Sequence, residues 1–122
     1  MSRSEESQDS AFSYYPVLQR VKAYVEANLE DGITRQQAAQ VAGLEAKYFS
    51  TFFRRKTGIS FTAWVAQLRV DRAKNMMQER DHTITQVALA VGFRDLRTFQ
   101  RAFKRHTGMT PRSFKSSVKP CR

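Results

Sequence analysis

Residues 34–44 read TRQQAAQVAGL and residues 83–93 read TITQVALAVGF, so Thr, Gln, Ala and Gly recur at matching positions 49 residues apart. The segments that follow also match. Residues 49–60 read FSTFFRRKTGIS and residues 99–110 read FQRAFKRHTGMT, at an offset of 50. A solenoid needs at least about three copies of its repeat. The pattern therefore predicts two copies of one supersecondary unit.

Each copy carries the start and stop signals of two short helices. It begins with the T-x-x-Q spacing of a capping box, in which side chains bind the free backbone N–H groups of a helix start. One glycine ends the first helix and another ends the second, because glycine adopts the left-handed conformation at little cost. These residues are Thr34, Gln37, Gly43 and Gly58 in the first copy, and Thr83, Gln86, Gly92 and Gly108 in the second. Helix, glycine turn and helix make a helix-turn-helix.

The rest of the chain also has helical periodicity. Its apolar spacing predicts a helix over 16–30, which begins at Pro16 and has Gly32 near its end. A long helix is expected over 61–78, and a last short helix begins at Thr110 and Pro111. The buried stripe of the long helix is predicted to be Phe61, Trp64, Val65, Leu68, Ala73, Met76 and Met77. The last short helix is expected to contribute Phe114. Because Phe114 follows Trp64 by 50 residues, each is expected to close its own unit.

No segment shows the sustained alternation of a strand, so we predict an all-α fold. It consists of two helix-turn-helix subdomains joined by a long linker helix, about seven helices altogether. The acidic, Ser-rich residues 1–12 are expected to form a disordered tail. The subdomains are expected over 13–60 and 80–118, and the linker helix over 61–79.

Composition narrows the functional class. The chain has 122 residues, 41% of them hydrophobic, which is enough for a core. Its 21 Lys and Arg against 11 Asp and Glu give a net charge of +10, with −3 over residues 1–46 and +13 over residues 47–122. Such a charge favours a polyanionic partner. The lone cysteine, Cys121, allows no internal disulfide and indicates a reducing, cytoplasmic compartment. No apolar run reaches the roughly 18 residues of a membrane span, and the polar amino end does not resemble a secretory signal.

The second helix of each copy has two distinct faces. One face carries phenylalanines for the core, and the other carries side chains that can donate hydrogen bonds to base edges or phosphates. The donor faces are Lys47, Ser50, Thr51 and Arg54 in the first copy, and Arg97, Gln100, Arg101 and Lys104 in the second. Neither donor face contains an acid. A membrane-surface helix is a poor alternative, because it would turn its aromatic face outward.

These residues resemble a known family. The run ITQVALAVGFRDLRTFQRAFKRHTGMTPRSFK, residues 84–115, is similar to the second helix-turn-helix of the AraC/XylS family of bacterial transcription regulators. The linker run RVDRAKNMM, residues 69–77, resembles that family's linker helix, and the resemblance extends over about residues 17–114. The matching positions in the second unit are Ile84, Ala88, Gly92, Phe93, Asp95, Phe99, Phe103, Lys104, Gly108, Thr110 and Pro111.

The resemblance implies that two recognition helices, about 46–56 and 96–106, enter successive major grooves on one face of an asymmetric double-stranded DNA site. It also implies activation through RNA polymerase, by a protein that binds as a monomer unless a separate domain dimerises it. By position it makes base readers of Lys47, Ser50 and Thr51 in the first unit and of Leu96, Arg97 and Arg101 in the second, with Leu96 acting through a thymine methyl. The base-reading set is then Lys47, Ser50, Thr51, Arg54, Leu96, Arg97, Gln100 and Arg101.

Other polar residues near these helices are assigned to the DNA backbone, because half or more of protein–DNA hydrogen bonds go to phosphate and sugar. The phosphate-binding candidates are Arg55, Lys56, Lys104, Arg105, Thr34, Arg35, Thr83 and Thr85. Glu45 stands where the family usually has serine. It either caps the helix through the helix dipole or repels a nearby phosphate, so the second unit is expected to read sequence more strictly. Arg69 and Arg72 of the linker are expected to be structural.

Several alternatives are weighed against this interpretation. A nonspecific, nucleoid-like nucleic-acid binder has a similar charge, and a helical module could bind an acidic protein instead. No enzymatic motif, cofactor or metal is expected, because His82, His106 and Cys121 lack partners at ligand spacing. The chain has no room for a sensing domain, so it is expected to be either a small stand-alone regulator or a DNA-binding domain taken from a longer protein.

Overall fold

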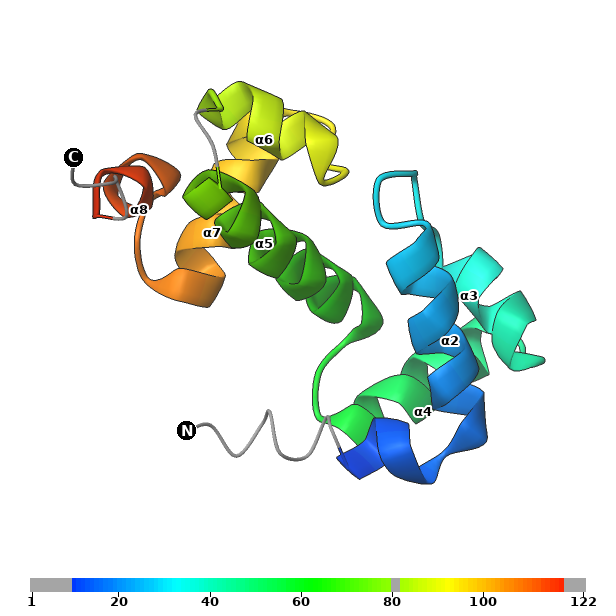
Figure 1. Ribbon diagram of the computed structural model, residues 1–122. Helices are drawn as coiled ribbons and strands as arrows, with labels where there is room; N and C mark the ends of the chain where they lie inside the picture. Colours follow the sequence, from blue (N-terminus) through cyan, green and yellow to red (C-terminus); the bar gives the residue numbers. More distant parts are fainter. Residues whose placement is uncertain (1–9, 80–81, 118–122) are drawn as a thin grey trace. The chain divides into compact units, whose positions relative to one another are not determined.

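A computed structural model describes residues 10–79 and 82–117. Over these residues the fold is all-α, as predicted, with helices α2 to α8, a further helical segment at residues 10–14 and no strand (Figure 1). The helices are α2 (Pro16–Ala27), α3 (Arg35–Ala42), α4 (Ala46–Thr57), α5 (Phe61–Glu79), α6 (Ile84–Ala90), α7 (Leu96–Thr107) and α8 (Pro111–Ser117). None of them is long and apolar enough to cross a membrane. The chain divides into two compact units between Val65 and Ala66, within α5.

Both capping boxes are present. The Thr34 hydroxyl accepts a hydrogen bond from the Gln37 backbone N–H at 3.1 Å, and the Gln37 side chain accepts one from the Thr34 N–H at 3.0 Å. The Thr83 and Gln86 pair repeats this arrangement at 3.0 and 2.9 Å. Gly43 follows α3 with a φ of 74°, a conformation that costs other residues about 1 kcal/mol or more. The local signals thus fix both helix starts and the turn after α3.

The core of the first unit is built on α4. Phe49 and Phe53 are completely buried, and the Phe53 ring lies 5.3 Å from the Trp64 ring of α5. Three apolar residues of α2 complete this core, namely Leu18, Val21 and Val25. Trp64 therefore closes the first unit, as predicted.

The amino end differs from the prediction. Residues 10–14 are helical, and Ala11 and Phe12, which the sequence assigned to a disordered tail, are buried. The Phe12 ring stacks on Trp64 at 5.0 Å and meets Phe53 edge-on at 5.9 Å. The prediction of a tail was therefore wrong for residues 10–12, while residues 1–9 lie outside the described residues.

The end of α2 also differs. The helix stops at Ala27, not at residue 30, and Asn28 follows as its C-cap. The Asn28 side chain donates a hydrogen bond to the Tyr24 carbonyl at 2.8 Å. Gly32 is not among the glycines with positive φ. A carboxamide cap has therefore taken the role that the sequence assigned to glycine.

The second unit has a core of its own. Phe99 and Phe103 of α7 are completely buried among residues of α5 and α6, and the Phe114 ring of α8 lies 5.4 Å from Phe103. Phe114 thus closes this unit as Trp64 closes the first. The residues that α5 contributes are Val70, Ala73 and Met77, of which Val70 was not predicted, whereas Leu68 and Met76 are only half-buried.

Helices α4 and α7 end in the same way. The Thr57 hydroxyl donates to the Phe53 carbonyl at 2.8 Å and receives the Ile59 backbone N–H at 3.3 Å. The Thr107 hydroxyl donates to the Phe103 carbonyl at the same 2.8 Å. Gly58 and Gly108 follow with φ of 83° and 81°. Each helix is therefore closed by one threonine and one left-handed glycine.

Candidate nucleic-acid interface

Helix α7 presents the predicted donor face. Arg97, Gln100, Arg101 and Lys104 are all exposed, while Phe99 and Phe103 on the opposite side are completely buried. The helix therefore has a fixed buried side and a side made of hydrogen-bond donors. Side chains of this type match the acceptor-rich edges of bases and phosphates.

Asp95 fixes the start of α7. Its carboxylate accepts a hydrogen bond from the Thr98 backbone N–H at 2.7 Å. That bond lowers the pKa of Asp95, so the carboxylate is ionised at neutral pH. Glu45 occupies the same place before α4, but its side chain makes no capping hydrogen bond. Glu45 can therefore stabilise the start of α4 only through its charge, which interacts with the helix dipole.

Helix α4 bears out part of its predicted donor face. Lys47, Thr51 and Arg54 are exposed, but the Ser50 hydroxyl oxygen is buried and has no hydrogen-bond partner among the described residues. Ser50 lies three residues before Phe53 and seven before the buried Thr57, so helical geometry turns it toward the core. The Ser50 hydroxyl therefore lies off the exposed donor face on which the sequence placed it, and its base-reading role stays a prediction.

Leu96 is also misplaced in the predicted set. It is half-buried and packs against the core of the second unit. It precedes Phe99 by three residues and Phe103 by seven, which puts it on the buried side of α7. Leu96 therefore contributes apolar surface to the core of the second unit, and its contact with a thymine methyl stays a prediction.

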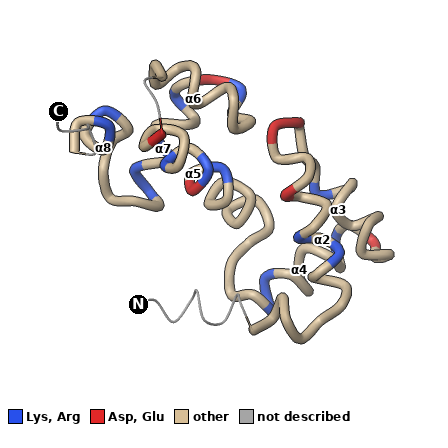
Figure 2. Tube along the Cα trace, viewed as in Figure 1, with Lys and Arg blue, Asp and Glu red and all other residues tan. Residues whose placement is uncertain are grey.

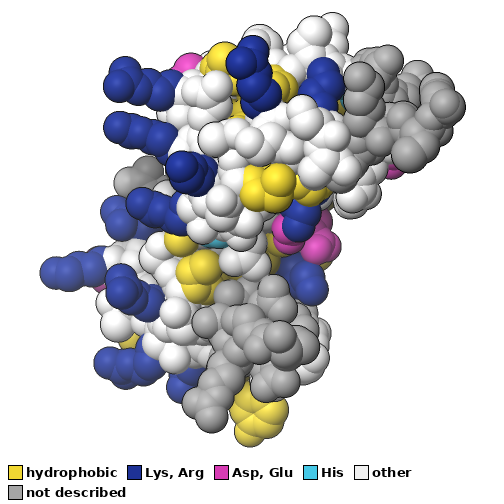
Figure 3. Space-filling model, turned by 90° about the vertical axis from the view of Figure 1, so that its left-hand side faces the viewer, with side chains coloured by type: hydrophobic (Ala, Val, Ile, Leu, Met, Phe, Trp, Pro, Cys, Tyr) yellow, Lys and Arg dark blue, Asp and Glu magenta, His cyan; other side chains and the backbone are white. Residues whose placement is uncertain are grey.

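The phosphate candidates are placed as follows. Arg55, Lys104 and Arg105 are exposed, whereas Lys56 is half-buried with its ammonium 5.3 Å from the centre of the Tyr15 ring. Neither α4 nor α7 contains an acidic residue, as Figure 2 shows. Figure 3 draws the Lys and Arg side chains that project from the surface. The four remaining candidates are all exposed at or near the starts of α3 and α6, namely Thr34, Arg35, Thr83 and Thr85.

Arg69 has the structural role expected from its sequence position. Its guanidinium lies 5.9 Å from the centre of the Phe93 ring, within the second unit. Burial lowers the pKa of Arg69, although an arginine remains charged under all ordinary conditions.

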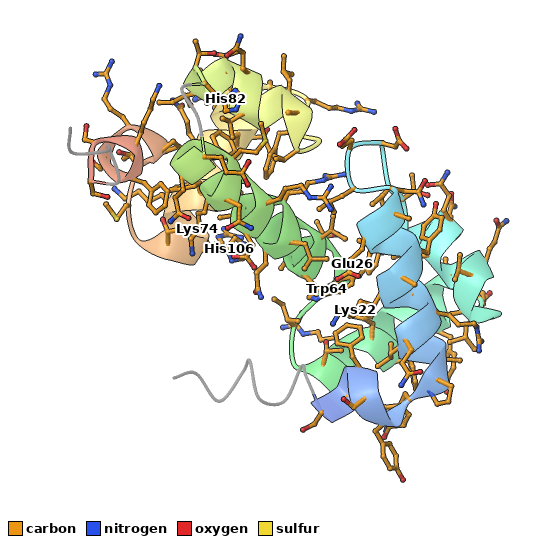
Figure 4. All side chains as sticks on the ribbon, viewed as in Figure 1. Lys22, Glu26, Trp64, Lys74, His82 and His106 are labelled. Atoms are coloured by element: carbon orange, nitrogen blue, oxygen red, sulfur yellow. The ribbon has the colours of Figure 1, made fainter. Side chains whose placement is uncertain are left out.

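Neither described histidine belongs to a group of side chains that could bind a metal ion. Within residues 10–79 and 82–117, no group of three His, Cys, Asp or Glu side chains could hold an ion. His106 is half-buried on α7, and Figure 4 labels it with His82 and with Lys74 of α5. Burial lowers the pKa of His106, Arg105 lowers it further, and Asp71 opposes them. Cys121 lies outside the described residues.

An aromatic group beside the donor face of α4 was missed by the sequence analysis. We call Tyr14, Tyr15, Tyr48 and Phe52 the aromatic flank. Tyr14 and Tyr48 are 77% and 57% exposed. The ring centres of Tyr48 and Phe52 are 6.3 Å apart, and those of Phe52 and Tyr15 are 5.9 Å apart. The spacing of Tyr48 and Phe52, four residues apart on one helix, could have revealed it.

Known proteins match this chain in sequence. A family model described as a helix-turn-helix domain matches residues 38–117. An uncharacterized HTH-type transcriptional regulator of Bacillus subtilis, YobQ, is 35% identical over 96 residues, which cover 79% of this chain and 40% of the relative. The regulator RipA of Corynebacterium diphtheriae is 41% identical over 78 residues, 64% of this chain and 23% of the relative. The chain thus spans less than half the length of these relatives.

Solved structures match its fold. A probable AraC family transcriptional regulator from Rhodopseudomonas palustris has a TM-score of 0.78 and 26% identity, covering 87% of this chain and all of that one. The DNA-binding domain of AdpA, solved in complex with a target DNA, has the same fold, with a TM-score of 0.78 at 24% identity over 85% of this chain and 93% of that one. The helix-turn-helix units, the family match and these neighbours agree, and the chain belongs to the AraC-type helix-turn-helix family of transcription regulators.

Proposed function

We propose that this regulator binds a specific, asymmetric double-stranded DNA site by inserting α4 and α7 into successive major grooves. The observation that carries the proposal is the donor face of α7, where Arg97, Gln100, Arg101 and Lys104 are exposed opposite two fully buried phenylalanines. A related fold, that of AdpA, has been solved on a target DNA. Activation through RNA polymerase and binding as a monomer belong to the same proposal.

Within this proposal the base-reading residues are Lys47, Thr51 and Arg54 on α4, and Arg97, Gln100 and Arg101 on α7. Arg101 is the clearest of them, because an exposed guanidinium can bind guanine O6 and N7 with two hydrogen bonds. Arg55, Lys104 and Arg105 are assigned to phosphates. Two recognition helices on one DNA face predict two short sequence boxes about one helical turn, or roughly 10 bp, apart.

The first experiment is selection from a randomised duplex library at near-physiological salt. An asymmetric motif with two boxes supports the proposal. Binding without any enriched sequence, which fades steeply as salt rises, would assign the chain to the nonspecific class. Very weak DNA binding even at low salt would instead favour an acidic protein partner.

Three variants of α7 then separate base contacts from phosphate contacts. Arg101→Ala should cost about 1–3 kcal/mol and relax selection at one base position. Arg101→Lys keeps the charge but loses the planar fork, so it should lose the base preference while keeping the salt dependence. Lys104→Ala should weaken binding to all sequences equally and reduce the salt slope by about one. Equal weakening by Arg101→Ala on every sequence would reassign Arg101 to a phosphate.

A further inference from the structure

The aromatic flank has two exposed rings, Tyr14 and Tyr48, beside the half-buried Tyr15 and Phe52. Tyr48 is 57% exposed although it stands in the middle of a helix-turn-helix unit. Exposed aromatic groups of this kind mark interaction surfaces more often than chance. The flank belongs to the first unit, and its occupant can be argued from its place on α4.

Tyr48 lies directly beside the donor face of α4. A helix turns about 100° per residue, so Tyr48 and Arg55, seven residues apart, share one stripe. Lys47, Thr51 and Arg54 form the adjacent stripe that the proposed function turns toward the bases. A helix in the major groove has a sugar–phosphate strand along each side. The stripe of Tyr48 and Arg55 then faces one of these strands.

The ring of Tyr48 packs beside another aromatic ring of α4. It stacks on Phe52 with an interplanar angle of 29°, and Phe52 meets Tyr15 at 79°. The Lys56 ammonium lies over the Tyr15 ring, 5.3 Å from its centre. A side chain that is already ordered loses little entropy on binding. The phenolic hydroxyl can therefore serve as a positioned donor.

The charge around the flank favours a polyanion over an apolar partner. Arg54, Arg55 and Lys56 are consecutive on α4, and the helix contains no acid. Glu45, the nearest acid in sequence, precedes the helix. In the second copy the position of Tyr48 is taken by Thr98, which is too short to reach as far. The flank is thus a property of the first unit.

We propose that the Tyr48 hydroxyl donates a hydrogen bond to a phosphate of the DNA strand beside α4, next to a phosphate held by Arg55. This inference rests on the proposed function, because it assumes that α4 lies in a major groove. It gives the first unit a backbone anchor that the second unit lacks.

The test measures binding of the full chain to its selected duplex at several salt concentrations. Tyr48→Phe removes only the hydroxyl and should weaken binding about tenfold, as expected for a hydrogen bond to a charged group. The loss should be equal on specific and unrelated duplexes. The salt slope should stay unchanged, because a neutral hydroxyl displaces no counterion, whereas Arg55→Ala should reduce it by about one. Tyr24→Phe on α2 is the matched control and should bind like the wild type.

Neutral methylphosphonates placed one at a time along the duplex then identify the phosphate. At one position the methylphosphonate should weaken binding of the wild type. The same substitution should not weaken binding of Tyr48→Phe any further, because that variant already lacks the hydrogen bond. Unchanged affinity of Tyr48→Phe at every salt, or a loss at one base pair only, would overturn the inference while leaving the proposed function intact. A wild type that binds no duplex would overturn both. Unchanged DNA affinity combined with altered self-association would assign the flank to a second copy of the chain.

Discussion

Replacement of Phe12 tests whether the segment before α2 is part of the first unit. The Phe12 side chain is 6% exposed, and its ring contacts those of Trp64 and Phe53. Burial of a phenylalanine contributes about 1.5–3 kcal/mol, and each aromatic pair adds about 0.5–1.5 kcal/mol. Because the end of a chain segment can relax around a gap, we expect Phe12→Ala to destabilise the first unit by about 3 kcal/mol, at the low end for such changes. For a unit of this size that lowers Tm by at least about 12 °C.

Trp64 supplies the assay. It is the single tryptophan of the chain and is buried in the core that Phe12 covers. Its fluorescence therefore follows unfolding of the first unit, while far-ultraviolet circular dichroism follows all helices. The Phe12→Ala transition seen by fluorescence should move to lower urea, and Tyr14→Ala, at a 77% exposed side chain, should stay within about 0.5 kcal/mol of the wild type.

The reasoning would be refuted by a Phe12→Ala variant that unfolds with the wild-type midpoint. Equal losses in Phe12→Ala and Tyr14→Ala would refute it as well, since these residues differ in burial. In the first case the contacts of Phe12 would contribute no stability, and the first unit would begin at α2. In the second case the burial of Phe12 would not explain its contribution.

Three further predictions concern single side chains. Ser50→Ala should leave stability unchanged or raise it by up to about 1 kcal/mol, because it removes an unpaired buried hydroxyl, with Thr51→Ala as the exposed comparison in urea denaturation. Asp95→Ala should lower the free energy of unfolding by about 1 kcal/mol, because the hydrogen bond from the Thr98 N–H is lost. Glu45→Ser should add a cap to α4 and stabilise the first unit by a similar amount. An Asp95→Ala variant as stable as the wild type would show that the cap is unimportant. Burial keeps the pKa of His106 in the folded protein below its value of about 6.5 in the unfolded chain. The contribution of His106 to stability is therefore complete above about pH 6.5 and is lost as the pH falls toward the folded pKa. His106→Gln should flatten the decline in stability between about pH 7.5 and 5.5, and an unchanged decline would exclude this cause.

Local signals predicted most of the fold correctly. Capping boxes and turn glycines act within a few residues, so the starts of α3 and α6 and the ends of α4 and α7 could be located from sequence. Phe12 could not be placed, because its partners Phe53 and Trp64 lie far along the chain and the residues before it are acidic and Ser-rich.

The errors in the site have a different origin. Ser50 and Leu96 were chosen by residue type and by family position, although both share the helical spacing of buried residues. The position of a residue around the helix axis matters more than the chemistry of its side chain, because a side chain turned into the core does not reach the exposed face. Tyr48 was overlooked because it was assigned to neither face of the helix, although it lies four residues before Phe52.

Separate cores have a consequence for how binding specificity can change. Each recognition helix is anchored by its own pair of phenylalanines and closed by its own threonine, Thr57 or Thr107. Substitutions on the outer surface of one helix leave the other unit's packing untouched, so their energetic effects should add. Under the proposed function, one half of the DNA site could then be recoded while the other half is kept. A duplicated unit of this kind allows evolution, or a designer, to alter recognition one box at a time.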